Sequence, residues 1–340
     1  MPIPKGGAGT PRILGAVIMA APIVAALVCI GIGRYSISVR ETLYVLCSPF
    51  TGNEIDGTAG TVIFNVRLPR ILQALLVGGG LAVAGASFQA LFSNPLATPD
   101  TLGVATGASF GAVLALLFHS DALTVQFSAM GFGFLALFAT TFISRQDGRN
   151  SVIMVVLAGI VVSALFEALL SLVQYVANPE DTLPTITYWL LGSMTKASYM
   201  GLASGLPLIV SGTLLIFLLR WRLNVLSLQE DEAKSMGINV RNTRLAVMTA
   251  STMVTAASIS LCGQVGWIGL LVPHMSRMLY GSDNRLVIPA SISLGGAMMV
   301  LIDTAARSAM AAEIPVSILT ALIGAPFFVF LLRKTRGARL

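Results

Sequence analysis

A series of long apolar runs is the feature that most constrains this chain, because each run is about as long as a helix must be to cross a bilayer. Polar residues, glycines and prolines separate the runs. They predict spans at 12–33, 71–91, 101–118, 127–144, 151–176, 202–220, 245–262, 265–280, 287–305 and 317–333. The eighth is short and contains Pro273. The pattern therefore predicts an all-α polytopic membrane protein with about ten transmembrane helices.

Charge content points the same way. Asp, Glu, Lys and Arg make up 11% of the 340 residues, whereas a soluble domain carries about 25%. So few charges cannot cover the surface of a water-soluble globule of this size. The spans and their short connections use up the chain, so we expect one transmembrane domain over residues 1–340 with no separate soluble domain.

The distribution of Lys and Arg predicts the orientation. With the N-terminus inside, 15 of the 21 basic residues fall on the inner side, which is the bias that inner loops show. The prediction is N-in and C-in. Arg67, Arg70 and Arg307 fall on the outer side against the bias. They indicate a partner on that side, although headgroup contact or snorkelling at a helix end would also explain them.

The expected spans contain few ionisable side chains. Glu167 and Asp303 are the main ones, and Asp303 can pair with Arg307 four residues later on the same helix face. A transporter coupled to an ion gradient would need more such groups. A membrane-embedded enzyme would need clustered His, Asp or Glu, and the three cysteines and two histidines have no metal-ligand spacing. We therefore predict no metal site and no catalytic residue.

The sequence of the inner segment 221–244 predicts a short capped helix between two spans. Gly237 suits the end of such a helix, and Ile238 can fold back against its last turn. The predicted apolar edge is Leu226, Leu228, Ala233 and Met236, and the polar part is Glu230, Asp231, Glu232 and Lys234. A helix of this kind outside the membrane is a docking element for a partner. A merely solvated loop is the alternative.

Glycines at four-residue spacing predict close helix packing in the third span. Gly103, Gly107 and Gly111 lie on one face of a helix. Membrane helices pack through such small residues because their backbones can then approach closely. This ridge predicts a compact bundle.

Seven stretches in a fixed order resemble the FecCD family of ABC-importer permeases. They are RLPR (67–70), GLAVAGASFQALFSNPLATPDTLGVATGASFGA (80–112), YWLLGSM (188–194), QEDEAKSMGI (229–238), GQVGWIGLLVPHMSR (263–277), GSDNRLVIP (281–289) and DTAARSAMAAEIPVSILTALIGAPFF (303–328). Small departures from the family pattern occur at Ser93 and Asn284. The set covers the chain from residue 67 almost to its end.

The resemblance implies a type II ABC-importer permease in the bacterial cytoplasmic (inner) membrane, embedded in lipid and without nucleic acid. It implies a second permease subunit, in a homodimer or with a close paralogue. It also implies two copies of a separate ABC ATPase that binds the ATP, and a periplasmic or lipid-anchored substrate-binding protein. No cofactor is expected in this chain, because it lacks a phosphate-binding loop motif.

The resemblance also assigns roles to residues. It implies that 229–238 contacts the ATPase, with Glu230, Glu232, Ala233, Met236, Gly237 and Ile238 as the coupling residues. It implies that Arg67, Arg70 and Arg307 pair with acidic residues on the binding protein. An iron–siderophore complex is the preferred cargo. Haem, cobalamin, molybdate or tungstate carried by the same machinery, or a stand-alone secondary transporter, are the alternatives.

Overall fold

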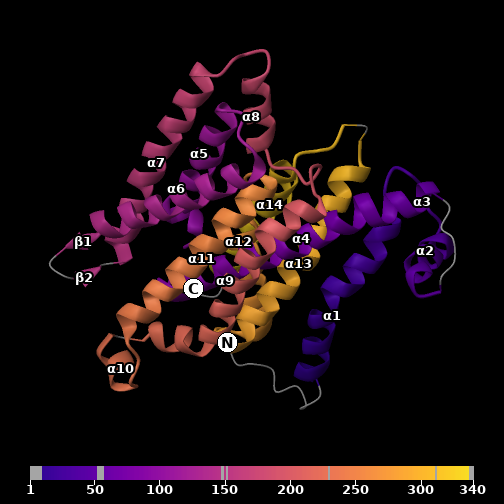
Figure 1. Ribbon diagram of the computed structural model, residues 1–340. Helices are drawn as coiled ribbons and strands as arrows, with labels where there is room; N and C mark the ends of the chain where they lie inside the picture. Colours follow the sequence, from indigo (N-terminus) through magenta and orange to yellow (C-terminus); the bar gives the residue numbers. More distant parts are fainter. Residues whose placement is uncertain are drawn as a thin grey trace.

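The computed structural model describes residues 10–51, 57–146, 149–150, 152–228, 230–310 and 312–336. Within these ranges, ten helices occupy the positions of the ten predicted spans (Figure 1). They are α1 (Thr10–Gly31), α4 (Leu68–Leu91), α5 (Val104–Leu117), α6 (Ala122–Ile143), α7 (Val152–Val176), α9 (Tyr199–Leu226), α11 (Val240–Cys262), α12 (Ile268–Tyr280), α13 (Asn284–Ser308) and α14 (Val316–Arg336). The even number of spans puts the start of α1 and the end of α14 on one side of the membrane.

Three of the ten helices are short. Seven helical segments among the described residues are long and apolar enough to cross a membrane by themselves, and α5, α12 and the apolar part of α14 are shorter. With 14 residues, α5 spans about 21 Å. It is short because the chain that leads into it is not helical over its whole length. The 3-10 turn η2 (Pro99–Leu102) and the left-handed residue Gly103, with φ of +74°, come first.

Several short elements lie outside the predicted spans. They are α2 (Val39–Thr51), α3 (Gly57–Thr61), the π-helical turn η1 (Val62–Arg67), α8 (Thr182–Leu190), α10 (Glu230–Ser235) and the strands β1 (Arg145–Gln146) and β2 (Arg149–Asn150). The two strands form an antiparallel pair between α6 and α7. Figure 1 shows α8 at one end of the helix bundle, and α10 with the strand pair at the opposite end. Only α10 was predicted from the sequence.

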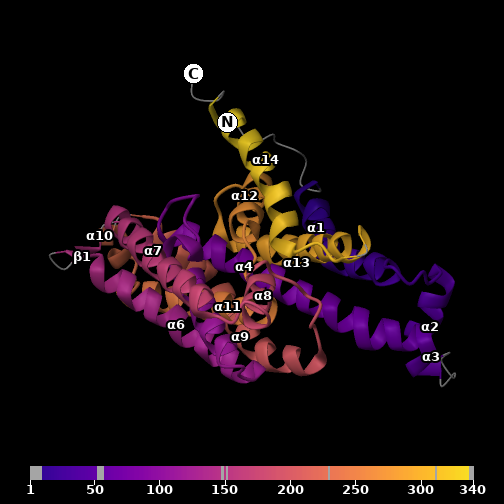
Figure 2. The ribbon, with the colours of Figure 1, turned by 90° about the horizontal axis from the view of Figure 1, so that it is seen from above.

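The most enclosed helix is α4, which lies in the middle of the bundle in Figures 1 and 2. It packs against α9, α11, α12 and α13, and 20 of its 24 residues are buried. Its glycines permit this packing. A Cβ atom added at Gly78 would lie 2.3 Å from the carbonyl oxygen of Gly295, and one added at Gly85 would lie 1.8 Å from that of Gly269. The backbones of α4, α12 and α13 therefore touch directly.

The start of the second span differs from the prediction. The predicted span begins at residue 71, but helical structure already begins at Gly57 and continues to Leu91. A proline inside a helix lacks the N–H donor and its ring crowds the carbonyl four residues earlier. The wider π-helical turn η1 ends directly before Leu68 and accommodates Pro69. Pro69 therefore lies in the first turn of α4, within a helical segment that starts earlier than the predicted span.

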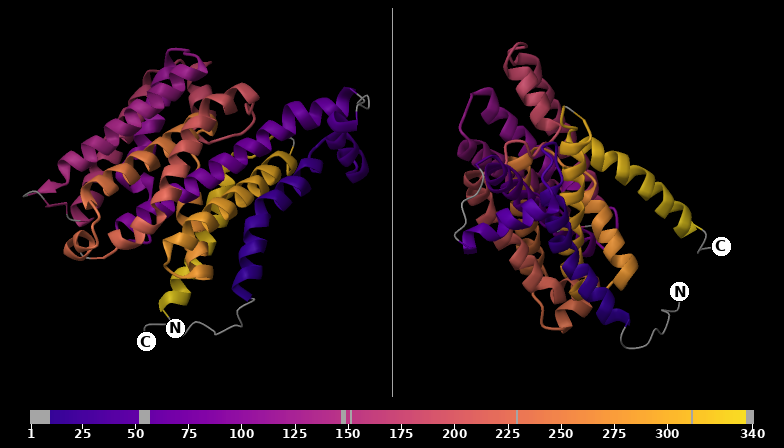
Figure 3. Two further views of the ribbon diagram at one scale, coloured as in Figure 1. Left: turned by 60° about the horizontal axis from the view of Figure 1, so that its bottom comes forward. Right: turned by 90° about the vertical axis from the view of Figure 1, so that its right-hand side faces the viewer.

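At the C-terminal end, α14 leans away from the bundle, as Figures 2 and 3 show. One side of it packs against α12 and α13. The other side exposes the large apolar residues Ile318, Leu322, Ile323, Val329 and Phe330. This face is available to lipid or to another subunit.

Candidate functional site

The three outer arginines converge where the end of α1 meets η1, α4 and α13. Arg67 Nη1 donates hydrogen bonds to the carbonyl oxygens of Ile30 (2.8 Å) and Gly31 (2.9 Å). Arg307 Nη2 donates to the carbonyl oxygen of Cys29 (2.7 Å). These are the last carbonyls of α1, which have no partner within the helix. Cations at the C-terminal end of a helix also interact favourably with its dipole, so the two arginines fix this end of α1.

The third arginine holds two carboxylates. Arg70 Nε lies 2.8 Å from Asp303 Oδ1 and 2.9 Å from Oδ2. Its two terminal nitrogens donate to Glu313, with Nη1–Oε1 3.0 Å and Nη2–Oε2 2.8 Å. Arg307 Nε lies 3.9 Å from Asp303 Oδ2, which is the pair of residues four apart that the sequence indicates. The cluster joins α4, α13 and the connection to α14.

The three outer arginines are buried in the protein rather than exposed on its surface. Arg67, Arg70 and Arg307 are only 2%, 5% and 7% exposed. Their guanidinium groups bond to carbonyls and carboxylates of the same chain, because a buried charge is costly unless it is paired and hydrogen-bonded. Arg307 Nε lacks a hydrogen-bond partner among the described residues. The role of the three arginines in docking a binding protein stays a prediction.

The coupling segment forms the short helix α10 between α9 and α11. Gly237 ends it in the left-handed conformation with φ of +76°, and its N–H donates to Lys234 O (2.9 Å). This is the helix end that the sequence predicts. Glu232 is exposed, and its carbonyl accepts a hydrogen bond from Met236 N (3.2 Å). The side chain of Glu230 lies outside the described residues.

Some apolar residues of the coupling segment are buried against the bundle, and others are exposed. Ala233 is 1% exposed and Ile238 is also buried, and both belong to a core cluster of the bundle. Met236 is 51% exposed and Leu228 is exposed too. The predicted single apolar edge is therefore wrong, because Ala233 packs inward against the protein itself. Met236 and Leu228 remain available to a partner.

A polar anchor supports the end of α9 just before the coupling helix. The Asn224 amide donates to Asp283 Oδ1 (2.7 Å) and accepts from the backbone N–H of Asn284 (2.8 Å). The hydrogen bonds from the Arg285 guanidinium lower the pKa of Asp283 to about 2. The carboxylate therefore stays ionised at neutral pH and ties α9 to the start of α13.

Two of the three predicted packing glycines lie between α5 and α6. A Cβ atom added at Gly107 would lie 2.7 Å from Ala136 Cβ, and one at Gly111 would lie 2.3 Å from the carbonyl oxygen of Ser128. Gly103 has another position. It precedes α5 in the left-handed conformation, and an added Cβ would meet Val162 Cγ1 on α7 at 3.0 Å. The three glycines therefore do not form one ridge.

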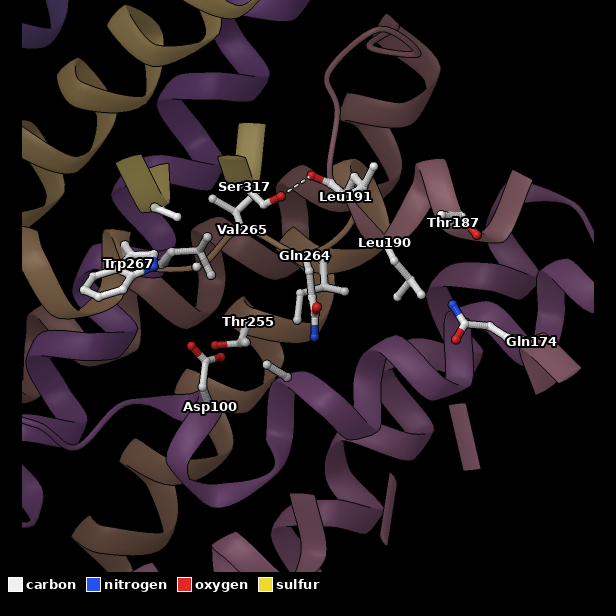
Figure 4. Close-up of a pocket in the computed structure, with 15 residues that line it drawn as sticks. Asp100, Gln174, Thr187, Leu190, Leu191, Thr255, Gln264, Val265, Trp267 and Ser317 are labelled. Carbon is white, nitrogen blue, oxygen red and sulfur yellow. Dashed lines mark hydrogen bonds between the residues drawn. The ribbon is translucent and has the colours of Figure 1, made fainter. Parts of the chain in front are cut away.

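A cavity of about 610 Å³ opens between α5, α7, α8, α11 and α14 (Figure 4). Its polar lining residues are Asp100, Gln174, Thr187, Thr255, Gln264 and Ser317. Its apolar wall is Leu81, Ala105, Leu190, Leu191, Ile259, Val265, Trp267 and Ala321, with Gly266. The lining therefore has one carboxylate and no lysine or arginine among the described residues. Apart from the Asp100 carboxylate, the side chains that line the cavity are neutral.

Trp267 links the cavity to α14. It has a φ of +70°, a conformation that side chains rarely adopt, directly before α12. Its ring packs on Gly324 of α14, where an added Cβ would lie 2.8 Å from the ring. Strained residues of this kind gather at functional sites. A shift of α14 would therefore displace Trp267 in the cavity wall.

The model of the FecCD transport family matches residues 21–334. This chain belongs to the FecCD family. As a FecCD permease it is a non-catalytic, multi-pass membrane subunit of a bacterial ABC importer. The family resemblance found in the sequence is thereby confirmed.

Individual relatives of this FecCD permease carry different cargoes. The molybdate import permease MolB of Haemophilus influenzae is 41% identical, over 92% of this chain and 93% of MolB. The hemin transport permease HmuU of Yersinia pestis is 34% identical, over 97% of this chain and 98% of HmuU. A solved metal-chelate type ABC transporter in an inward-facing conformation matches with a TM-score of 0.86 and 38% identity, over 95% of this chain and 99% of that chain. The ten-helix, type II importer fold is thus confirmed.

Sequence reasoning missed the cavity residues of this FecCD permease. Asp100 follows a proline in a connection and resembles an ordinary turn residue. Gln174 and Gln264 are single polar residues near the ends of spans. One signal in the sequence could have indicated these residues. Burying a carboxylate or a glutamine side chain beside apolar runs costs free energy unless the group faces water or a ligand. Their convergence depends on five helices whose packing the sequence does not reveal.

Proposed function

We propose that this permease moves a metal chelate, preferably an iron–siderophore complex, across the bacterial inner membrane. The observation that carries the proposal is the cavity. Its volume of about 610 Å³ suits part of a bulky chelate, and its described lining has one carboxylate and no lysine or arginine, a charge balance that disfavours a free oxyanion. Molybdate is the second candidate, favoured by the 41% identity with MolB.

Uptake with the cognate binding protein tests the cargo. Proteoliposomes that contain the complete importer are offered ferric trihydroxamate, hemin, cobalamin and molybdate in turn. The proposal expects ATP-dependent accumulation of the ferric chelate, at least about tenfold above molybdate. Accumulation of molybdate alone would contradict the chelate as cargo and identify the permease as a molybdate importer.

The chain performs no covalent chemistry in this proposal. Two ATPase subunits bind and hydrolyse ATP, and their closure moves the coupling segment 229–238 of each permease. This movement tilts the helices between outward- and inward-facing states, which must each be stabilised by different contacts. A second permease copy would complete the path, and the exposed apolar face of α14 supports such a contact. The cargo passes between the two copies.

Replacing Met236 by aspartate is expected to release the ATPase. Met236 is exposed next to α10, and a buried charge in an interface is costly. Co-purified ATPase should fall at least about tenfold, while the permease stays folded. Asn242→Asp adds the same charge at an exposed position nearby and should keep the ATPase. Mass measurement of the solubilised complex reads out both, with two permease and two ATPase chains expected for the parent. Full ATPase content in Met236→Asp would contradict this docking site.

A binding protein docks on the outer face around Arg67, Arg70 and Arg307 in this proposal. Two carboxylates, Asp303 and Glu313, offset only part of the charge of the three arginines, so the cluster keeps a net positive charge. The exposed Arg34 and Arg40 add to it on the same side. Such a field attracts an acidic partner and weakens with salt. Equal capture of the binding protein at low and high salt would argue against it.

A further inference from the structure

The transmembrane helix α7 carries a narrow polar stripe. Apart from Tyr175, its polar residues are Ser163, Glu167, Ser171 and Gln174, and the rest are apolar or glycine. Spacings of four, four and three residues place all four on one face of the helix. The stripe runs along the border between the buried and exposed sides, since Ser163 and Gln174 are half-buried and Glu167 and Ser171 are exposed.

Both ends of this stripe lead to the cavity. Gln174 lines it directly. At the other end, the Ser163 hydroxyl donates to the backbone carbonyl of Asp100 (3.4 Å), and the Asp100 side chain also lines the cavity. Figure 4 shows Asp100 and Gln174 on opposite sides of the cavity. Glu167 lies between these ends, one helical turn after Ser163 and two turns before Gln174.

Neither carboxylate has an ion-pair partner in the described part of the chain. No hydrogen bond to the side-chain oxygens of Asp100 or Glu167 occurs there, in contrast to Asp303. Glu167 is exposed near the middle of a span, where a charge facing lipid is costly. It shares one face of α7 with Gln174, which lines the cavity. The carboxylate in the cavity lining and the carboxylate on the adjoining stripe of α7, with no lysine or arginine in either set of residues, give this region a negative potential.

We propose that Asp100 and Glu167 form an acidic wall that determines which cargo passes, favouring neutral or cationic metal chelates over free oxyanions. The inference rests on the proposed function, because it concerns the same path. Carboxylates that line a pore exclude anions and attract cations in the same way. The amide and ammonium hydrogens on the surface of a chelate can donate to these carboxylates in passing.

Charged thiol reagents test the acidic wall without any cargo. In a Cys47→Ser background, Gln174→Cys places a thiol on the stripe, while Cys29 and Cys262 are buried. A cationic trimethylammonium-ethyl thiosulfonate should label it at least about tenfold faster than an anionic sulfonatoethyl thiosulfonate. Each rate is first divided by the rate of that reagent with a free small thiol. Attraction and repulsion by the two carboxylates produce the difference.

Neutral isosteres then identify the source of the charge. Asp100→Asn together with Glu167→Gln should bring the ratio close to one, and each single change should lower it part of the way. Leu123→Cys, at the exposed start of α6, is the matched control, and its ratio should be the same with and without the two isosteres. A ratio near one in the parent, or a ratio that the double change leaves intact, would overturn the proposal.

Uptake separates this proposal from the proposed function. In the reconstituted importer, the double isostere should reduce the preference for a cationic over a neutral ferric trihydroxamate by about tenfold. An unchanged preference would overturn the acidic wall as the selecting element, while chelate import itself stands. Import of molybdate alone by the parent would contradict the proposed cargo. It would also contradict selection by charge, whatever labelling ratio the thiol reagents give.

Discussion

Replacing Arg70 by alanine is expected to lower the free energy of unfolding by about 3–5 kcal/mol, because it leaves two carboxylates without their partner in a buried position. Asp303 is 1% exposed, and both of its oxygens accept from Arg70 Nε. The loss should appear as a lower unfolding temperature of the detergent-solubilised permease and as a lower yield of folded protein.

The control for this prediction is the exposed pair of Arg285 and Asp283, whose side chains are 60% and 31% exposed. Exposed pairs contribute about 0–1 kcal/mol, so Arg285→Ala should have a small effect on unfolding. Equal effects of Arg70→Ala and Arg285→Ala would contradict a structural role for the buried cluster. The same reasoning means that weaker binding-protein capture by Arg70→Ala cannot by itself demonstrate docking.

Replacing Gly85 by alanine is expected to be the most damaging single methyl addition in the central helix. Its Cβ would lie 1.8 Å from the carbonyl oxygen of Gly269, which is backbone and cannot rotate away. Overpacking in a well-packed interior costs about 3 kcal/mol, so folded yield and unfolding temperature should both fall.

Gly131→Ala on α6 is the matched control for Gly85→Ala. It adds the same methyl group where no heavy atom lies within 4 Å, and alanine is favoured over glycine in a helix by up to about 1 kcal/mol. Its unfolding temperature should stay the same or rise. Similar behaviour of the two variants would show that α4 and α12 are not in direct backbone contact.

The spans could be predicted because membrane insertion imposes a simple rule of length and apolarity. All ten predicted spans have a helix in the structure, including the weak eighth span, which is the 13-residue α12. The rule says nothing about short helices outside the hydrocarbon region. For that reason α2 and α8 were missed, as was the helical extension before Pro69.

The environment of the arginines could not be predicted from the sequence. The sequence indicates that Arg70 lies on the outer side of the membrane, where basic residues are uncommon. It does not reveal its partners Asp303 and Glu313, which lie 233 and 243 residues away in the chain. Only the packing of α4 on α13 brings them together. Ala233 and Met236 show the same limit at smaller scale, because periodicity places both on a short helix without indicating that Ala233 packs inward.

We propose that this permease moves a metal chelate with energy from ATP that its partner subunits hydrolyse. The most direct measurement is accumulation of a ferric trihydroxamate in proteoliposomes that contain this chain, its ATPase and its binding protein. We expect accumulation with ATP on the ATPase side, and none with an ATPase that cannot hydrolyse ATP. Accumulation without ATP, driven by a proton or sodium gradient, would show instead that the chain works as a stand-alone transporter.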